Sequence, residues 1–324
     1  MMQMQATKQH SNSKNKKRNV EVAIGDEKLT VKEASELFNV NRNTIYSRLR
    51  RGQPAITNDE MNKLNRKNYY SLGMDRQYMS VSLFKKFIQC EASTMAYLNG
   101  EYVEFPKAAM LVGSYTHAAF ESDAAFKEFV DKHNNVIFKK NGSKYADYAQ
   151  ADVMIESLKN DKFAMFAMEG EKEQIYTANV FGIDWKMKVD SINHERKLFT
   201  DLKTTQDLHK RYWSEKYDGW VSFIEKWDYL LQMAMYRKII EANTGELYTP
   251  YIVAVSKEKI PNKAVIYFDE SRFEFEYEYV ETELERINRV KNGEVEPHAC
   301  GKCDYCKSTK KLKEPIEVGE LIYE

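Results

Sequence analysis

The spacing of apolar residues divides most of the chain into a helical first half and a second half that contains strands. Apolar residues recur at helical spacing over 80–98 and 113–130, and more weakly around 147–168. From residue 181 to residue 192 apolar and polar positions alternate instead, which is typical of a half-buried strand. A second strand over 197–205 follows a turn-like segment, so the two predict a β-hairpin.

The remaining pattern predicts an α/β protein. We expect a long helix over 225–242, strands over 249–256 and 263–269, and a charged amphipathic helix over 270–292. Helices before and after a short group of strands indicate a sandwich in which helices cover a mixed sheet.

Alternation assigns the faces of the first hairpin strand. The apolar face carries Phe181, Ile183, Trp185, Met187 and Val189, and the polar face carries Asp184, Lys186, Lys188 and Asp190. Only the first of these faces is expected to be buried in the core.

The N-terminal residues have a different character. We expect a disordered basic arm over 1–20, a small helix-turn-helix over 21–52, a linker over 53–66 and one large domain over 67–324. The apolar helix faces would be formed by Ala34, Leu37 and Phe38 and by Ile45 and Leu49, and the residues expected near a DNA backbone are Arg42, Arg48, Arg50 and Arg51. DNA contact is favoured for a basic helical pair of this kind, and a helical appendage without DNA binding is the alternative.

Charge is unevenly distributed along this neutral chain of 324 residues. Residues 1–52 contain 11 Lys/Arg and 5 Asp/Glu, a net charge of +6, so the remainder carries −6. An acidic body that handles DNA must do so through a local basic channel and bound cations. The polar N-terminus has no signal-peptide pattern and no apolar run could cross a bilayer, so we expect a cytoplasmic protein without membrane contact.

Two carboxylates and a lysine of the hairpin form the candidate site. Asp201 and Lys203 share one face, and a hairpin centred on Glu195 and Arg196 places Asp190 directly opposite Asp201. Opposed residues have Cβ atoms roughly 4.5–5.5 Å apart, and carboxylates at that distance are tolerated where a divalent cation lies between them. The alternative is a surface charge ladder with one salt bridge.

Four ordered motifs give this arrangement a family resemblance. The segments VD (189–190), DLKT (201–204) and QMAMY (232–236), preceded by GSYTHAAFE (113–121), resemble the RecB-like branch of the PD-(D/E)xK nucleases. The most similar group is the exodeoxyribonuclease VIII (RecE) group of phages and prophages. The segment YMSVSLFKKFIQCEA (78–92), which opens the large domain, also resembles this group. The resemblance extends over about residues 67–308 and implies a restriction-endonuclease-like core.

The resemblance implies a role for each site residue. It makes His117, Asp190, Asp201 and the backbone carbonyl of Leu202 ligands of Mg²⁺ or Mn²⁺, Lys203 the catalytic lysine, and Gln232 and Tyr236 residues that orient substrate or water. Glu121 is a weaker candidate ligand. Many members of the superfamily carry Glu where this chain has Asp201, and either residue supplies a carboxylate.

The resemblance also implies an activity. RecE-like enzymes degrade linear double-stranded DNA from its 5′ ends, leave 3′ single strands for a RecT-like annealing partner, and form ring-shaped homo-oligomers. Two alternatives stay open: a nuclease of different polarity or an endonuclease, and a helix-turn-helix DNA-binding protein with an inactive nuclease fold.

Cysteines and tryptophans supply two further patterns. Cys90 with Cys300, Cys303 and Cys306 gives four thiols, enough for a four-iron, four-sulfur (4Fe–4S) cluster or for structural Zn²⁺. The tight spacing of the last three and the similarity to AddB-type nucleases favour the iron–sulfur cluster, and free thiols are the alternative. Three tryptophans, Trp213, Trp220 and Trp227, recur every seven residues, which favours packing or subunit contact over base stacking.

Overall fold

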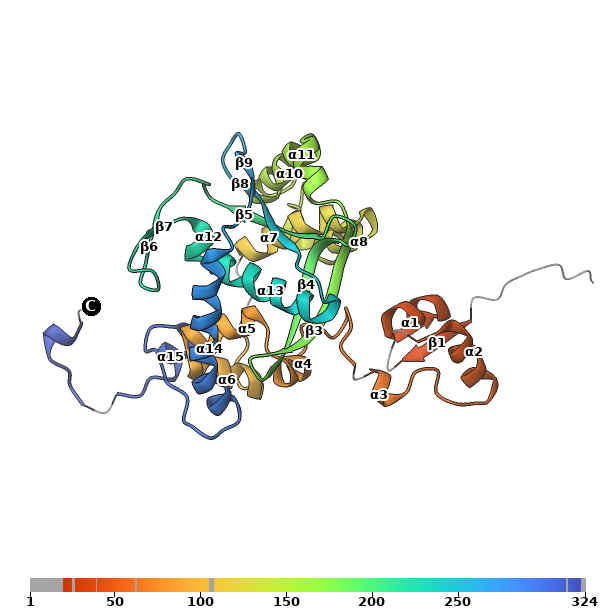
Figure 1. Ribbon diagram of the computed structural model, residues 1–324, viewed down its shortest axis with the longest axis horizontal. Coiled ribbons are helices and arrows are strands. Elements are labelled where there is room, and N and C mark those ends of the chain that lie inside the picture. The colour runs from red at the N-terminus through yellow and green to blue at the C-terminus, as the bar shows by residue number, and fades with distance from the viewer. Residues whose placement is uncertain are drawn as a thin grey trace, which may run out of the picture. The chain divides into compact units, whose positions relative to one another are not determined.

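The computed structural model describes residues 20–24, 27–38, 40–61, 63–104, 108–312 and 314–321. The predicted arm therefore lies outside the described residues except for its last position. The chain divides into two compact units, Met1–Ser71 and Leu72–Glu324, which are described separately (Figure 1).

The N-terminal unit combines a β-hairpin with short helices. Strands β1 (Glu21–Ile24) and β2 (Glu27–Thr30) pair antiparallel, and α1 (Val31–Phe38), α2 (Arg42–Arg50) and α3 (Asn58–Met61) follow. Val22, Val31, Ala34, Val40, Ile45, Ala55 and Ile56 form its buried core. The hairpin was not predicted, because four-residue strands are too short for alternation to stand out.

Part of the predicted linker belongs to this unit, and one predicted DNA-contacting arginine has another role. Ala55 and Ile56 are 7% and 4% exposed. The Arg48 guanidinium donates hydrogen bonds to both carboxylate oxygens of Glu60, at 2.7 and 3.1 Å, and to the Ala55 carbonyl. Arg48 therefore holds residues 55–60 against the helix pair, and the linker prediction begins too early.

The main unit is built on a five-stranded mixed sheet, which confirms the predicted fold class. Its strands lie in the order β3 (Glu171–Val180), β4 (Ile183–Asn193), β5 (Leu198–Thr205), β8 (Thr249–Ser256) and β9 (Lys263–Ile266). Only the pair β5–β8 is parallel. The connection between those two strands contains β6 (Tyr212–Ser214), β7 (Gly219–Val221), α12 (Phe223–Lys226) and α13 (Tyr229–Thr244).

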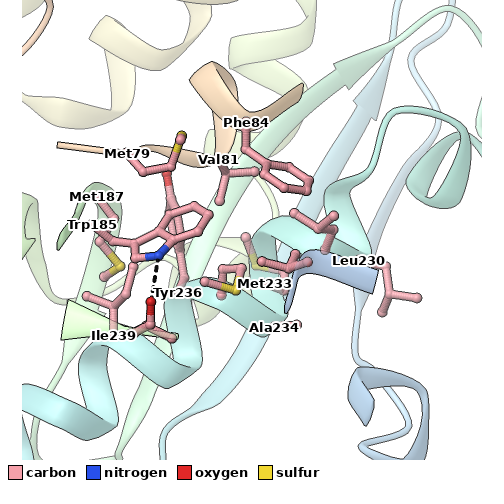
Figure 2. Close-up of a cluster of buried hydrophobic side chains, with 14 of the residues drawn as sticks. Met79, Val81, Phe84, Trp185, Met187, Leu230, Met233, Ala234, Tyr236 and Ile239 are labelled. Atoms are coloured by element: carbon pink, nitrogen blue, oxygen red, sulfur yellow. Dashed lines mark hydrogen bonds between the residues drawn. The ribbon is translucent and has the colours of Figure 1, made fainter. Parts of the chain in front are cut away.

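Helices cover both faces of the sheet. On one face α13, α5 (Val81–Gln89) and α14 (Ser271–Lys291) enclose the main core, and on the other α10 (Ala146–Lys159) and α11 (Lys162–Ala167) pack against Leu202, Val253 and Val255. Figure 2 shows the Trp185 ring among Met79, Val81 and Ile239, with its indole N–H donating to the Val180 carbonyl at 3.1 Å. The buried members of the predicted apolar face of β4 therefore anchor the sheet to the helices.

Several of the predicted helices are split in two, including the stretch around 147–168, which forms α10 and α11. Residues 80–98 form α5 and α6 (Glu91–Asn99), and residues 113–130 fall within α7 (Ala108–Glu121) and α8 (Asp123–Lys132). Cys90 and Ser122 separate them with extended backbone and cap the following helices through their side chains. Shorter elements are α4 (Leu72–Gln77), α9 (Asn134–Ile137), α15 (Asp304–Thr309) and a 3₁₀ turn (Val318–Leu321). Among the described helices, none is long and apolar enough to cross a membrane.

The polar face of β4 departs from the prediction at Lys186. Strand β5 pairs with only the last three residues of β4, so Met79 occupies the free edge and its carbonyl accepts the Lys186 amide at 2.7 Å. The Lys186 side chain is 1% exposed and its Nζ lies 2.7 Å from Asp75 Oδ1. Lys186 is thus a buried ion-pair partner and not a solvated side chain.

Candidate active site

The register of the central hairpin is the one predicted from its turn. Strands β4 and β5 pair at Ser191–Thr200, Ile192–Phe199 and Asn193–Leu198, so the next opposed pair along the chain is Asp190 and Asp201. The ladder ends before that pair, and the Leu202 amide donates to Asp190 Oδ2 at 2.8 Å. The separating strands therefore turn a backbone donor toward a carboxylate.

Asp190 is held ionised by its surroundings. His117 Nδ1, from α7, lies 3.0 Å from Asp190 Oδ2. Burial raises the pKa of Asp190, but the charges of His117 and Lys203 and the Leu202 amide outweigh it and lower that pKa to about 2. Burial likewise opposes protonation of His117, and Asp190 reverses the effect and raises the pKa of the imidazole.

Asp201 lies deeper, with only 3% of the residue exposed. Its Oδ1 accepts a hydrogen bond from Gln232 Nε2 at 2.8 Å, and its Oδ2 lies 2.5 Å from Lys203 Nζ. Burial and the nearby Asp190 charge raise the pKa of Asp201, while Lys203 opposes that rise. Asp201 Oδ2 is buried, and the Lys203 ammonium is its close polar neighbour.

Lys203 completes the group. Its Nζ lies 4.5 Å from the centre of the Tyr229 ring, in addition to its contact with Asp201. Burial lowers the pKa of Lys203, and the charge of Asp201 outweighs burial and raises it. The lysine is therefore a fixed cation at neutral pH, in contact with the Asp201 carboxylate.

The residues present fit a divalent cation. Two carboxylates approach each other where β4 and β5 separate, and Asp201 is buried with its Oδ2 against the Lys203 ammonium. Carboxylate oxygens are the ligands that Mg²⁺ and Mn²⁺ prefer. Ligation by His117, which is hydrogen-bonded to Asp190 here, and by the Leu202 carbonyl stays a prediction.

A small pocket beside Asp190 contains an acidic residue that the sequence did not reveal. His117, Glu121, Lys172, Glu173 and Asp190 are among its lining residues. Glu173 is 8% exposed, has a backbone φ of 54° and pairs with Lys188. Burial, then Asp190, raises the pKa of Glu173. No signal pointed to Glu173, because strand β3 itself was not predicted.

Helix α13 places its two candidate residues differently. Gln232 reaches Asp201, as described above. Tyr236 is 9% exposed and packs in the apolar core, where Figure 2 shows it near Met233 and Ile239. The hydrogen bond that orients the carboxylate therefore comes from Gln232.

The four cysteines come together in space, although Cys90 is distant in sequence from the other three. Their four Sγ atoms all lie within 4.8 Å of one another. The Sγ atoms of Cys90 and Cys306 are 3.6 Å apart, and those of Cys300 and Cys306 are 3.9 Å apart. Backbone amides of Cys303 and Cys306 point at two of the sulfurs, at 3.3 and 3.4 Å. Burial opposes ionisation of Cys300, but the amides of Lys302 and Cys303 lower its pKa to about 6. Four sulfur donors around one point are a ligand set that fits a metal ion.

Comparison with known proteins places this geometry in a family. Residues 80–309, more than two thirds of the chain, match the family described as "PDDEXK-like domain of unknown function (DUF3799)". The chain belongs to this PD-(D/E)xK-like family. The matched region includes every candidate site residue and all four cysteines, and excludes the N-terminal unit.

Solved structures include one clear relative. The chain is 34% identical to a protein from Eubacterium rectale described as a "Putative exonuclease", with a TM-score of 0.76, covering 80% of this chain and 98% of that chain. The structure of SSO0001 is 16% identical with a TM-score of 0.26, covering 69% of this chain and 91% of that one, and it carries no argument. None of the curated proteins matches this chain. Family and relative together support a nuclease.

Proposed function

We propose that this PD-(D/E)xK protein is a Mg²⁺-dependent exonuclease that degrades linear double-stranded DNA. The observation that carries the proposal is the group formed by Asp190, Asp201 and Lys203 where β4 and β5 part. Asp190 and Asp201 would hold a divalent cation, which would supply positive charge against the phosphodiester and activate water. Lys203 stabilises negative charge that develops on the phosphate, and Gln232 fixes the orientation of Asp201.

Direction and partners follow from the resemblance to RecE-like enzymes. We infer cleavage from 5′ ends, so that 3′ single strands remain for a RecT-like annealing protein, by a homo-oligomer. The similarity to the Eubacterium rectale protein, described as a "Putative exonuclease", supports an exonuclease. The N-terminal unit would add DNA affinity through exposed arginines such as Arg50 and Arg51.

We further propose that the four cysteines hold a structural metal. Four thiolates at about 2.3 Å from one ion lie roughly 3.8 Å apart, close to the two separations of 3.6 and 3.9 Å. In a 4Fe–4S cluster each sulfur binds a different iron, which spreads the sulfurs further. The distances thus favour a single tetrahedral ion such as Zn²⁺ over the cluster that the sequence spacing favours. Metal analysis of purified protein, together with visible absorption, distinguishes the two.

The test of the activity is digestion of a linear duplex labelled at either the 5′ or the 3′ end. The wild type, Asp201→Ala and Asp184→Asn are compared with Mg²⁺, Mn²⁺ or EDTA. Asp184 is an exposed carboxylate of the same strand as Asp190 and serves as the matched control. Progressive Mg²⁺-dependent release of the 5′ label, lost only in Asp201→Ala, supports the proposal. Intact DNA with folded wild type and added metal refutes it.

A further inference from the structure

The β6–β7 hairpin carries an exposed pair of tryptophans. Trp213 and Trp220 are cross-strand partners whose rings meet edge to face at 6.0 Å, and they are 49% and 64% exposed. Trp227, which follows in α12's C-terminal cap, is 49% exposed. The seven-residue recurrence favoured packing, but within this chain these rings lie at the surface. Figure 1 shows the hairpin at the margin of the main unit, beside α12.

The turn of this hairpin is held by buried charge. Lys216 Nζ lies 2.5 Å from Glu276 Oε2 and 3.1 Å from Asp228 Oδ1, and the Tyr217 hydroxyl donates to Glu276. The Glu276 side chain, on α14, is 0% exposed. A turn fixed by a buried ion pair gives the tryptophan pair a defined position, as a preorganised binding surface requires.

Cations are interleaved with these aromatic rings. The Arg211 guanidinium lies 5.7 Å from the Trp220 ring centre, and Lys210 Nζ lies 5.3 Å from that of Tyr212. Lys226 Nζ donates to the Trp213 carbonyl at 2.8 Å. Alternating aromatic and basic side chains are the composition that binds single-stranded nucleic acid, with bases on the rings and phosphates on the cations. A second copy of this face would have to bring the same cations together, which is unfavourable.

The hairpin is continuous with the candidate active site. It follows directly on β5, the strand of Asp201 and Lys203. The Tyr229 ring lies 4.5 Å from Lys203 Nζ and 5.4 Å from Lys85 Nζ, and Lys85 in turn donates to the Trp227 carbonyl. A basic and aromatic path therefore leads from Lys203 to Trp227, whose ring lies 6.0 Å from that of Tyr212 in the hairpin.

We propose that the β6–β7 hairpin binds an unpaired DNA strand by stacking its bases on Trp213 and Trp220. This rests on the proposed nuclease function, since it assigns the hairpin to the strand that is separated at the duplex end. The rings hold the bases, Arg211 and Lys210 hold the adjacent phosphates, and the path described above directs the backbone to Lys203.

The experiment uses the full chain in EDTA, so that binding is measured without cleavage. The probe is a 20-nucleotide oligothymidylate, and the readouts are quenching of tryptophan fluorescence and anisotropy of a labelled copy. Stacking contributes about 1–3 kcal/mol per base, so W213A/W220A should weaken binding at least tenfold and lose the quenching. W213F/W220F, which keeps two ring faces, should retain most of the affinity. Phe163→Ala, an exposed aromatic of α11, is the matched control and should change nothing.

The outcomes separate this proposal from the nuclease proposal. Unchanged oligothymidylate affinity in a folded W213A/W220A protein overturns the role of the hairpin, whatever the cleavage assay shows. A change of oligomeric state in sedimentation, without loss of affinity, overturns it in favour of a subunit contact. Loss of affinity in that variant supports it, even if the wild type fails to cut DNA and the nuclease proposal falls.

Discussion

The buried ion pair of Lys186 and Asp75 predicts an asymmetric loss of stability. The Lys186 side chain is 1% exposed, and that of Asp75 is 14% exposed and also accepts the Tyr97 hydroxyl at 2.7 Å. Asp75→Asn leaves a buried ammonium beside a neutral amide. Lys186→Met removes the charge itself and keeps an unbranched side chain of similar length, while Asp75 keeps Tyr97 and its partial exposure.

The size of the effect follows from the cost of removing the carboxylate from a buried ion pair. Removing one partner of a buried pair costs roughly 3–5 kcal/mol, whereas replacing both charged residues with neutral ones is often nearly neutral. We therefore expect Asp75→Asn to lower the free energy of unfolding by about 3–5 kcal/mol. Lys186→Met should lower it by less, because Asp75 keeps the Tyr97 hydroxyl and its partial exposure. At about 2–4 °C per kcal/mol for a unit of this size, Asp75→Asn lowers Tm by roughly 6–20 °C. The double variant should unfold close to Lys186→Met.

Thermal and urea unfolding of the two single variants and the double variant, followed by circular dichroism, measures this asymmetry. Asp184→Asn, an exposed carboxylate of the same strand, is the control and should unfold like the wild type. If Lys186→Met were as destabilising as Asp75→Asn, or more so, the charge would not be the cause. The reasoning from burial would then be refuted.

Three further predictions concern the sites. Gln232→Ala removes the charge-assisted hydrogen bond to Asp201, worth about 1.5–3 kcal/mol, so kcat on linear duplex should fall by about ten- to hundredfold with the fold intact by circular dichroism. Cys306→Ser should reduce the metal content of purified protein and lower its Tm, and an unchanged Tm with full metal content would contradict the structural role. Burial, opposed by Asp228, lowers the pKa of Lys85 to about 8, so this lysine loses its charge as pH rises through that value. DNA affinity in EDTA should therefore fall between about pH 7 and 9, and the fall should be smaller in Lys85→Met, as anisotropy titrations would show.

The sequence predicted the central hairpin well because its turn and its alternation are local. Equal spacing from Glu195 and Arg196 correctly opposed Asp190 and Asp201, as the Ser191–Thr200 pair shows. Strand β8 was predicted with its observed bounds, since its apolar run is buried on both faces. Signals of this kind depend on neighbours in the chain, so no tertiary information was needed.

Features that depend on distant segments could not be predicted. Burial of Lys186 requires Asp75 and Met79, which lie about a hundred residues earlier. Glu173 lies in an edge strand with mixed burial, which has no clean alternation. The exposure of Trp213 and Trp220 depends on the ion pair that holds the hairpin turn against α14, and a seven-residue spacing gives no information about that contact.

The geometry of the candidate site depends on a local failure of strand pairing. If β4 and β5 stayed paired past Ser191, the Leu202 amide would be used within the sheet, whereas here it donates to Asp190. On its other side Asp190 has no partner in the pairing of β3 with β4, because the register passes over Glu173, which has a positive φ. Strand β5 stops pairing with β4 after Thr200, but it pairs with β8 along its full length, from Leu198 to Thr205. The backbone of Asp201 and Lys203 is therefore held in place. One rigid strand beside one that has separated holds Asp201 and Lys203 in place while exposing their face toward Asp190, and in the proposed nuclease this fixed geometry is what preorganised electrostatic catalysis requires.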